Sequence, residues 1–257
     1  MADEIRIIEY KENQFTEKED CVVDEHQLAI HLNGTPYISL MCLPRDLDEL
    51  TIGFLFSEGI IRSFQDIVSI DSDLQTDVFV VLRDAPHTQT KEKTVRVVPT
   101  GFANRSLILP QVDDGTVPAI TSGLQISADS ILSMIAEFNH QSELFQQTGA
   151  VHSCKLVLED GASLFFEDVG RHNALDKIVG RALMLDLSIE HGILLTSGRI
   201  SSEMLIKTAG LGIPCIVSIS APTRMAVEMA RKLNLTLIGF ARGSRFNLYS
   251  GEHRILP

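Results

Sequence analysis

The first clear run of apolar and polar positions in the chain predicts a β-hairpin over residues 27–42. Two largely apolar stretches, residues 27–32 and 37–41, flank the dipeptide Asn33-Gly34. Asn and Gly both tolerate a positive φ angle, which the two-residue turns of hairpins require. The pattern therefore predicts two antiparallel strands that are joined by a tight turn.

The spacing of apolar residues after Pro44 predicts a helix that ends near Gly59. Its first turn carries three carboxylates, and these favour a helix start because they oppose the positive end of the helix dipole. Further short strands are predicted over residues 67–70, 77–82 and 94–98. This part of the chain is therefore predicted to form a small α+β domain.

A polar stretch without sustained periodicity, residues 83–125, predicts a long loop. The helical pattern that follows covers residues 128–140, and Ser127 precedes it as a candidate N-cap. We place the boundary between two domains here. The prediction is an N-terminal α+β domain over residues 1–126 and an α/β domain over residues 127–257.

Short apolar strands alternate with amphipathic helices in the second half of the chain. The predicted strands cover residues 151–158, 163–168, 193–197, 215–219 and 235–240. The predicted helices cover residues 172–185, 201–211 and 223–233. This alternation indicates an α/β layer in which helices cover a largely parallel or mixed sheet.

Charge is distributed unevenly along the 257 residues, whose formal net charge is -12. Residues 1–150 carry 24 acidic and 10 basic side chains, whereas residues 151–257 carry 10 acidic and 12 basic ones, eight of them arginine. The overall negative charge makes nucleic acid an unsuitable partner. The arginines of the second half are suited to forked contacts with phosphate.

Two further properties of the sequence bear on the location of the protein in the cell. No apolar run reaches the length of about 20 residues that a membrane-spanning helix needs, and the acidic start does not resemble a secretory signal. Four cysteines occur singly along the chain, at Cys21, Cys42, Cys154 and Cys215. We therefore expect a cytoplasmic protein with reduced thiols and no membrane partner.

Three predicted turns between a strand and a helix combine glycine or proline with arginine and hydroxyl side chains. They cover residues 167–173, 196–203 and 220–224. Free N–H groups at a helix start favour an anion, and arginine adds positive charge. A fourth segment, residues 239–249, places Arg242 and Arg245 on either side of a Gly-Ser pair. Each turn alone is equally explained by N-capping or by surface arginines. Residues 220–224 are the weakest candidate. Taken together, however, the four segments predict a large anionic ligand.

Two enzyme classes agree less well with the sequence. Zinc deaminases use H-x-E and P-C-x-x-C ligand sets, but here His152 lacks the following glutamate and Cys215 lacks the second cysteine. Many serine hydrolases carry their nucleophile in a G-x-S-x-G turn, and neither candidate serine of this sequence lies in such a motif. We therefore predict no zinc site, and a nucleotide-modifying enzyme is the weaker hypothesis.

Several of these segments resemble the formate dehydrogenase accessory protein family (FdhD). The longest runs through residues 167–177, and it begins with the motif Glu-Asp-Val-Gly-Arg-His-Asn. Further segments that resemble the family are residues 33–34, 44–46, 53–55, 57–61, 197–199, 202–204, 220–223, 239–240 and 247–249. The resemblance extends over nearly the whole chain, from about residue 25 to about residue 250.

The resemblance implies both a function and a fold. Members of the family are known as sulfur carriers that take sulfur from a cysteine desulfurase. They pass it to the molybdenum cofactor, a bis-molybdopterin guanine dinucleotide, before the cofactor enters formate dehydrogenase. The fold implied for the second half is a cytidine-deaminase-like α/β layer, so that the chain as a whole is α+β. The resemblance also implies a homodimer.

The residues expected to bind the cofactor come from two sources. The resemblance associates cofactor binding with one segment, composed of Phe240, Ala241, Arg242, Gly243, Ser244 and Arg245. The first two glycine–arginine turns add Gly170, Arg171, His172, Asn173, Ser197, Gly198 and Arg199. The arginines would pair with phosphates, and the glycines would allow the backbone to approach them.

The sequence departs from the family pattern at the sulfur-carrying cysteines. The family normally has a CxxC pair in a loop between its two halves, but the corresponding residues 97–106 contain no cysteine. Sulfur transfer needs an accessible thiol with a low pKa. We therefore assign no catalytic residue and leave open whether the chain is an enzyme. The alternative is a cofactor-binding chaperone without sulfur-transfer activity.

Overall fold

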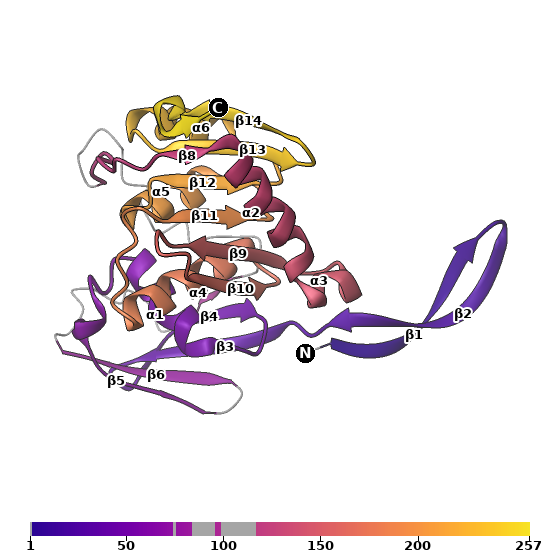
Figure 1. Ribbon diagram of the computed structural model, residues 1–257. Coiled ribbons are helices and arrows are strands. Elements are labelled where there is room, and N and C mark those ends of the chain that lie inside the picture. The colour runs from indigo at the N-terminus through magenta and orange to yellow at the C-terminus, as the bar shows by residue number, and fades with distance from the viewer. Residues whose placement is uncertain (1, 74–75, 84–95, 99–116) are drawn as a thin grey trace.

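The computed structural model describes residues 2–73, 76–83, 96–98 and 117–257. Two sheets stack in layers with helices between and around them, and a two-stranded ribbon projects from this body (Figure 1). The described part is therefore a mixed α/β structure with several sheets.

The larger sheet holds six strands from the second half of the chain. In spatial order they are β10 (Ser163–Asp168), β9 (His152–Val157), β11 (Ile193–Thr196), β12 (Cys215–Ser218), β13 (Thr236–Arg242) and β14 (Arg245–Ser250). Strands β11, β12 and β13 run parallel to one another, whereas β9 runs antiparallel to β10 and β11, and β14 runs antiparallel to β13. The predicted strands, and a sheet of mixed direction, are confirmed.

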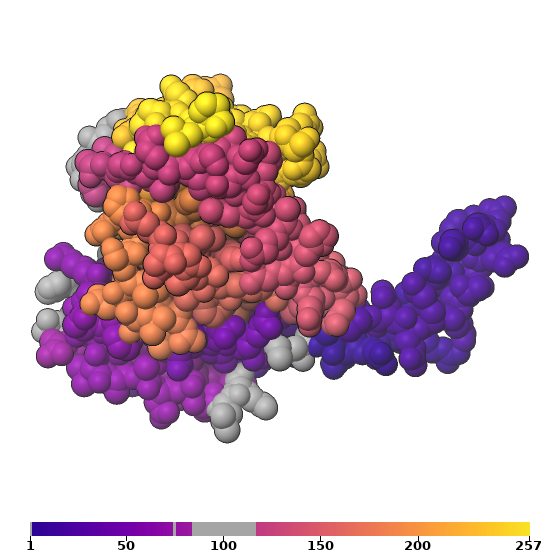
Figure 2. All heavy atoms as spheres, in the orientation of Figure 1, coloured from indigo at the N-terminus to yellow at the C-terminus, as the bar shows by residue number. Residues whose placement is uncertain are grey.

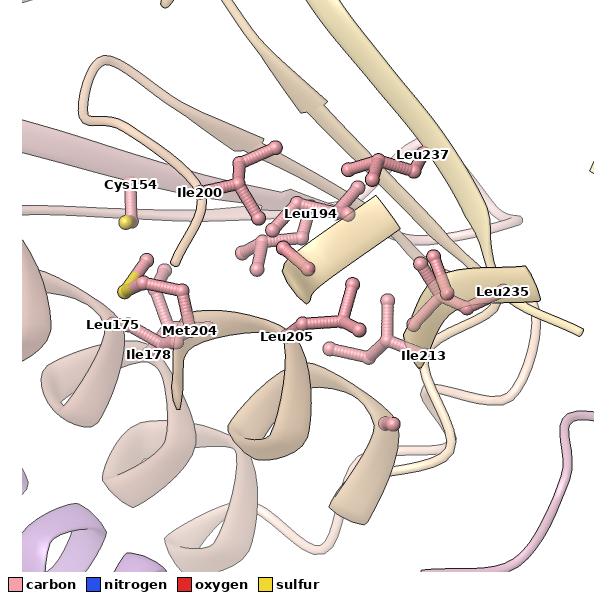
Figure 3. Packing of buried hydrophobic residues seen from close by; sticks show 14 of the residues in the cluster. Cys154, Leu175, Ile178, Leu194, Ile200, Met204, Leu205, Ile213, Leu235 and Leu237 are labelled. Atoms are coloured by element: carbon pink, nitrogen blue, oxygen red, sulfur yellow. The ribbon is translucent and has the colours of Figure 1, made fainter. Parts of the chain in front are cut away.

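Helices cover both faces of this sheet. Helix α4 (Arg171–Met184), α5 (Ser202–Gly210) and α6 (Arg224–Lys232) bury their apolar residues on one face, and α2 (Ala128–Gln141) covers the other. Figure 3 shows Leu175, Met204 and Leu205 of the first group packed against Leu194 and Leu237 of the strands. The four predicted helices are confirmed, and Ser127 caps α2 by accepting a hydrogen bond from the backbone N–H of Ser130.

The smaller sheet contains the predicted hairpin. Its strands in spatial order are β5 (Ile67–Ser72), β6 (Asp77–Leu82), β3 (His26–Leu32), β4 (Thr35–Cys42) and β7 (Arg96–Val98). The turn between β3 and β4 has φ angles of 49° at Asn33 and 79° at Gly34, as the sequence predicts. The side-chain oxygen of Asn33 also accepts a hydrogen bond of 2.9 Å from the backbone of Leu82, which joins the turn to β6.

Helix α1 (Leu47–Ser57) covers the smaller sheet and packs directly on α4. Two glycines allow the backbones of these helices to touch. A Cβ atom on Gly53 would lie 1.8 Å from the carbonyl oxygen of Asp176, and one on Gly180 would lie 2.0 Å from that of Glu49. The two halves of the molecule therefore meet at the α1–α4 interface. The backbones of the two helices lie closer there than any residue larger than glycine at positions 53 and 180 would allow.

Charged side chains of the second half are buried and paired at this junction, and two of them accept hydrogen bonds from the first half. The carboxylate of Asp168 accepts a hydrogen bond from the backbone of Leu43 at 3.1 Å and lies 2.8 Å from the ammonium group of Lys177, and both charged side chains are fully buried. Asp176 binds Lys207 at 2.7 Å and accepts a hydrogen bond from Ser57. These charges sit deep in the protein, and each has a partner of opposite sign.

Several elements were not predicted. Strands β1 (Ala2–Lys11) and β2 (Gln14–Val23) form the projecting ribbon, which we call the arm (Figure 2). Helix α3 (Glu143–Thr148) lies beside the root of the arm. Strand β14 closes one edge of the larger sheet, and the short strands β8 (Ile126–Ser127) and β15 (Ile255–Leu256) pair with each other.

The predicted loop over residues 83–125 lies partly outside the described residues, which leave out 84–95 and 99–116. Its described part contains β7, which matches the strand predicted near 94–98. Val117 and Ile120 at its end pack into the core of the larger sheet. The domain boundary between residues 126 and 127 stays a prediction. Among the described residues, no helix is long and apolar enough to span a membrane.

Candidate functional site

The glycine–arginine turns of the sequence meet at one edge of the six-stranded sheet. Because β10 and β11 both run antiparallel to β9, they end on the same side of the sheet, and β12 and β13 end there too. We call this side the carboxyl edge. Ligands of open α/β sheets bind at such an edge, where strands end and helices begin.

Backbone contacts connect neighbouring turns along the carboxyl edge. The hydroxyl of Ser218 donates a hydrogen bond of 2.7 Å to the carbonyl oxygen of Gly198. The N–H of Thr223 donates to the carbonyl of Ile200 at 2.9 Å, and the N–H of Phe240 donates to that of Ser220 at 2.9 Å. The turns predicted separately from the sequence therefore form one continuous surface.

Gly198 fixes the position of Arg171. A Cβ atom on Gly198 would lie 2.9 Å from the Cβ atom of Arg171 and 3.1 Å from its Cδ atom. The stem of this arginine thus lies directly on the glycine backbone. A larger residue at position 198 would displace the guanidinium group. Gly198 is therefore required for the position of Arg171 as well as for the turn.

Positive charge accumulates where the first two turns meet. Burial and the nearby guanidinium group of Arg199 lower the pKa of Arg171. Burial and then both arginines lower the pKa of His152. Among the described residues Arg199 has no carboxylate partner in an ion pair, and it is exposed. The electrostatics of this surface therefore favour an anion.

His172 is a deeply buried titratable group of this surface. It is 7% exposed, and burial, with Lys207 and Arg171 as further causes, lowers its pKa to about 3. Its Nε2 atom lies 3.8 Å from the carboxylate of Glu203, and its Nδ1 atom has no hydrogen-bond partner within the described part of the chain. Burial raises the pKa of Glu203. His172 is therefore neutral at physiological pH.

The hydroxyl of Ser197 lies between two residues of β9. It accepts a hydrogen bond of 2.9 Å from the backbone N–H of Ser153, and it lies 3.3 Å from Nδ1 of His152. These contacts fix the turn after β11 against the start of β9. Sequence reasoning missed His152 as part of this surface, because the first residue of a strand reaches the carboxyl edge only when that strand runs antiparallel to its neighbours.

Gly170 and Asn173 take part in the buried junction between the halves. The side-chain amide of Asn173 donates to the carbonyl oxygen of Met41 and to the carboxylate of Asp168, both at 2.8 Å. The N–H of Gly170 donates to the same carboxylate at 3.0 Å. These groups are occupied by structural bonds, and a role for the two residues in cofactor binding stays a prediction.

The segment from Phe240 to Arg245 forms the hairpin between β13 and β14, beyond the end of β12. A register shift lies between Gly239 and Arg242, and Phe240 takes a φ angle of 53°. The guanidinium of Arg242 lies 5.9 Å from the ring centroid of Phe240.

The side chains of this hairpin differ in their access to a ligand. Ala241 is fully buried, so it can meet a ligand only through its backbone. The exposed residues at the tip are Arg242, Gly243, Ser244 and Arg245. Within the part of the chain that the structure describes, no hydrogen bond or ion pair joins this tip to Arg171 or Arg199.

Metal and thiol chemistry have few candidate residues. The described residues contain no group of three or more His, Cys, Asp or Glu side chains that could hold a metal ion. Burial raises the pKa of Cys42, Cys154 and Cys215 to about 12 in each case. Cys21, on β2 of the arm, is the one cysteine of the chain that is partly exposed.

Comparison with known proteins gives a consistent result over the whole chain. A family model described as the FdhD/NarQ family matches residues 23–256. A protein of Bacillus pumilus named "Sulfur carrier protein FdhD" is 39% identical over 251 residues, which cover 97% of this chain and 95% of the relative. A protein of Bacillus subtilis with the same name is 38% identical over 248 residues, which cover 96% of this chain and 94% of the relative.

A solved structure is similar as well. The crystal structure of a protein described as a formate dehydrogenase accessory protein, from Desulfotalea psychrophila, superposes with a TM-score of 0.79. The match covers 99% of both chains at 29% sequence identity. The layered arrangement and the carboxyl edge thus belong to a fold that has been observed by experiment.

Proposed function

The chain belongs to the FdhD/NarQ family, and from this premise we propose that it is a sulfur carrier that serves the maturation of formate dehydrogenase. The names of its curated relatives and of the similar solved structure support this function over that of an unrelated nucleotide-modifying enzyme. They also favour sulfur transfer over the alternative of a chaperone that only binds the cofactor.

The cargo that we propose is the molybdenum cofactor in its guanine dinucleotide form, bound along the carboxyl edge. The observation that carries this proposal is the cluster formed by Arg171, Arg199 and His152, in which Arg199 lowers the pKa of Arg171 and both arginines lower the pKa of His152. A dinucleotide with two phosphate groups supplies the negative charge that such a cluster attracts. The scaffold in this proposal is a cytidine-deaminase-like layer that has kept the ligand-binding edge.

Each residue of the carboxyl edge has a distinct role in this proposal. Arg171 and Arg199 pair with phosphate oxygens, and Gly198 holds Arg171 in place. His172 is neutral at physiological pH, so it adds no charge beside the arginines, and its buried Nδ1 atom has no protein partner in the described part of the chain. The tip residues Arg242 and Arg245 add a second pair of cations and contact a more distant part of the cargo.

The experiment that tests cofactor binding is calorimetry with GDP and ADP on the purified protein. We expect guanine-selective binding with micromolar affinity, and a loss of at least tenfold in the double variant Arg242→Ala, Arg245→Ala. Variant Arg6→Ala is the matched control, because Arg6 is an exposed arginine of the arm, which lies outside the carboxyl edge, and it pairs with Glu17 of the same arm. Equal affinity for GDP and ADP, or unchanged affinity in the double variant, would contradict the proposed site.

Sulfur transfer restricts the choice of thiol. The thiolate is the attacking species, and the three buried cysteines have pKa values near 12 and no access to a donor. Cys21 is partly exposed, so we propose that it receives the sulfur. Its thiolate attacks the outer sulfur of the desulfurase persulfide, a new S–S bond forms as the old one breaks, and the desulfurase cysteine leaves as a thiolate.

Mass spectrometry after incubation with a cysteine desulfurase and cysteine tests this step. The expected result is one added sulfur atom, located on Cys21 and absent from Cys21→Ser. If no cysteine gains sulfur, the cofactor-binding chaperone replaces the sulfur carrier as the proposed function. The other expected partner is formate dehydrogenase, and we propose that all these proteins meet in the cytoplasm.

A further inference from the structure

Glu203 is a carboxylate of the carboxyl edge that receives no hydrogen bond within the described part of the chain. It lies in the first turn of α5, next to Met204 and Leu205, whose side chains are fully buried in the core (Figure 3). The Glu203 side chain is 22% exposed, and Nε2 of His172 lies 3.8 Å from it, which is too long for a hydrogen bond. Its carboxylate oxygens are therefore available to a donor from outside the chain.

The other carboxylates of these turns already have partners. Glu167 is buried and lies 2.7 Å from the guanidinium group of Arg45. Asp168 is buried and lies 2.8 Å from the ammonium group of Lys177. The turns of the carboxyl edge contain no further acidic residue besides Glu203. Because an ionised carboxylate only accepts hydrogen bonds, a ligand of Glu203 must carry N–H or O–H donors.

Glu203 also stands beside the positive charges of this edge. Burial raises the pKa of Glu203, and the charges of Lys207 and Arg171 oppose that rise. Lys207 is paired with Asp176 at 2.7 Å, whereas Arg171 forms no ion pair among the described residues. The edge thus offers a positively charged donor and a carboxylate acceptor that do not satisfy each other. A ligand that fits both carries an anionic group and N–H donors.

We propose that Glu203 binds the 2-amino-4-oxopyrimidine ring of the cargo, an inference that rests on the proposed function of the carboxyl edge. Guanine and pterins share this ring, whose ring N–H and amino group point in the same direction. The two oxygens of a carboxylate accept one hydrogen bond from each of these donors, as they do from the forked donors of arginine. Adenine presents an unprotonated ring nitrogen at the corresponding position, which a carboxylate repels. Glu203 is therefore the residue that selects the ring.

A purely structural role of Glu203 has a different experimental signature. An acidic residue in the first turn of a helix stabilises that helix, because its charge opposes the positive end of the helix dipole. This effect does not depend on which ring a ligand carries. Loss of a structural role would lower the melting temperature and weaken the binding of all ligands alike. Equal losses for every ligand would therefore contradict the inference.

Calorimetry on the purified chain tests the inference with GDP, IDP, 6-hydroxymethylpterin and inorganic pyrophosphate. IDP differs from GDP only in lacking the amino group of the ring, so it leaves one hydrogen bond to Glu203 unmade. The wild type should bind GDP about tenfold more tightly than IDP. In Glu203→Gln this preference should disappear, because the side-chain NH2 group of glutamine faces a second donor. Affinity for pyrophosphate should stay the same or rise, since a negative charge near Arg171 is lost.

Glu190→Gln is the matched control, because Glu190 is exposed and precedes β11, at the opposite edge of the sheet. It should keep the preference for GDP over IDP. An affinity loss in Glu203→Gln that is confined to GDP assigns the ring to guanine, and a loss confined to the pterin assigns it to the pterin. Unchanged affinity for both ligands would overturn this inference alone. A wild type that binds neither GDP nor pyrophosphate would overturn the proposed cargo site as well.

Discussion

The junction between the halves and the carboxyl edge use charge in opposite ways. At the junction, Asp168 and Lys177 are fully buried and paired, and Asp176 is paired with Lys207. At the carboxyl edge, Arg171 and Arg199 lie close enough that each opposes the charge of the other. In the interior, the paired carboxylates of the second half accept hydrogen bonds from Leu43 and Ser57 of the first half and so hold the two halves together. At the edge, the positive charges are available to an external anion.

Removal of one buried charge should have the largest effect on stability. Lys177→Met leaves the carboxylate of Asp168 buried without its cation, and breaking such a pair costs about 3–5 kcal/mol. Chemical denaturation should show this loss in the free energy of unfolding. Affinity for guanine nucleotide, measured on the fraction that remains folded, should stay close to that of the wild type. A loss below about 1 kcal/mol would contradict the assigned role of the pair.

The α1–α4 interface can be tested with a single methyl group. Gly180→Ala places a Cβ atom against the backbone of Glu49, and we expect a loss of about 1–3 kcal/mol because the two helices must separate. Gly210→Ala is the matched control: it lies at the end of α5 with nothing within 4 Å, so its effect should be neutral or slightly stabilising. Equal melting temperatures of the two variants would refute the close contact.

At the carboxyl edge the expected loss is in binding rather than in stability. Arg171→Gln keeps much of the side-chain stem on Gly198 but removes the positive charge. Nucleotide affinity should fall about tenfold, which corresponds to about 1.4 kcal/mol, while the melting temperature should stay the same or rise as repulsion with Arg199 disappears. Calorimetry measures the affinity and thermal melting measures the stability. A variant that loses stability without losing affinity would contradict the role of Arg171 in binding.

The smallest effect concerns pH. The pKa of His172 falls from its ordinary value of 6.5 to about 3 on folding, so between these values the unfolded chain binds the extra proton and stability decreases as pH falls. Between pH 7 and pH 6 the loss from this group should be below about 1 kcal/mol. Denaturation curves for the wild type and His172→Asn should diverge in this direction, and identical pH dependence would show that the histidine is solvated.

Much of the fold could be predicted because its signals are local. The Asn33-Gly34 turn, the cap at Ser127 and the apolar spacing of α4 each act within a few residues. The arm could not be predicted in this way. Its strands are exposed on both faces over most of their length, so they lack the alternation of buried and exposed positions that indicates a strand.

The candidate site shows the same division between local and distant information. The glycine–arginine turns were visible in the sequence, because turn geometry and helix starts select particular residues over short stretches. The structural role of Asn173 was not visible, since its amide binds the backbone of Met41 from a distant part of the chain. The contribution of His152 depends in the same way on the antiparallel pairing of β9 with β11.

The α1–α4 interface has a consequence for how the protein is made. Helix α1 leaves the ribosome more than 100 residues before α4 does, and at typical rates of synthesis this interval is on the order of 10 s. Throughout that time the surface around Gly53, shaped to receive another backbone, faces solvent or a chaperone. The first half of the chain therefore completes its fold only after translation has passed Met184.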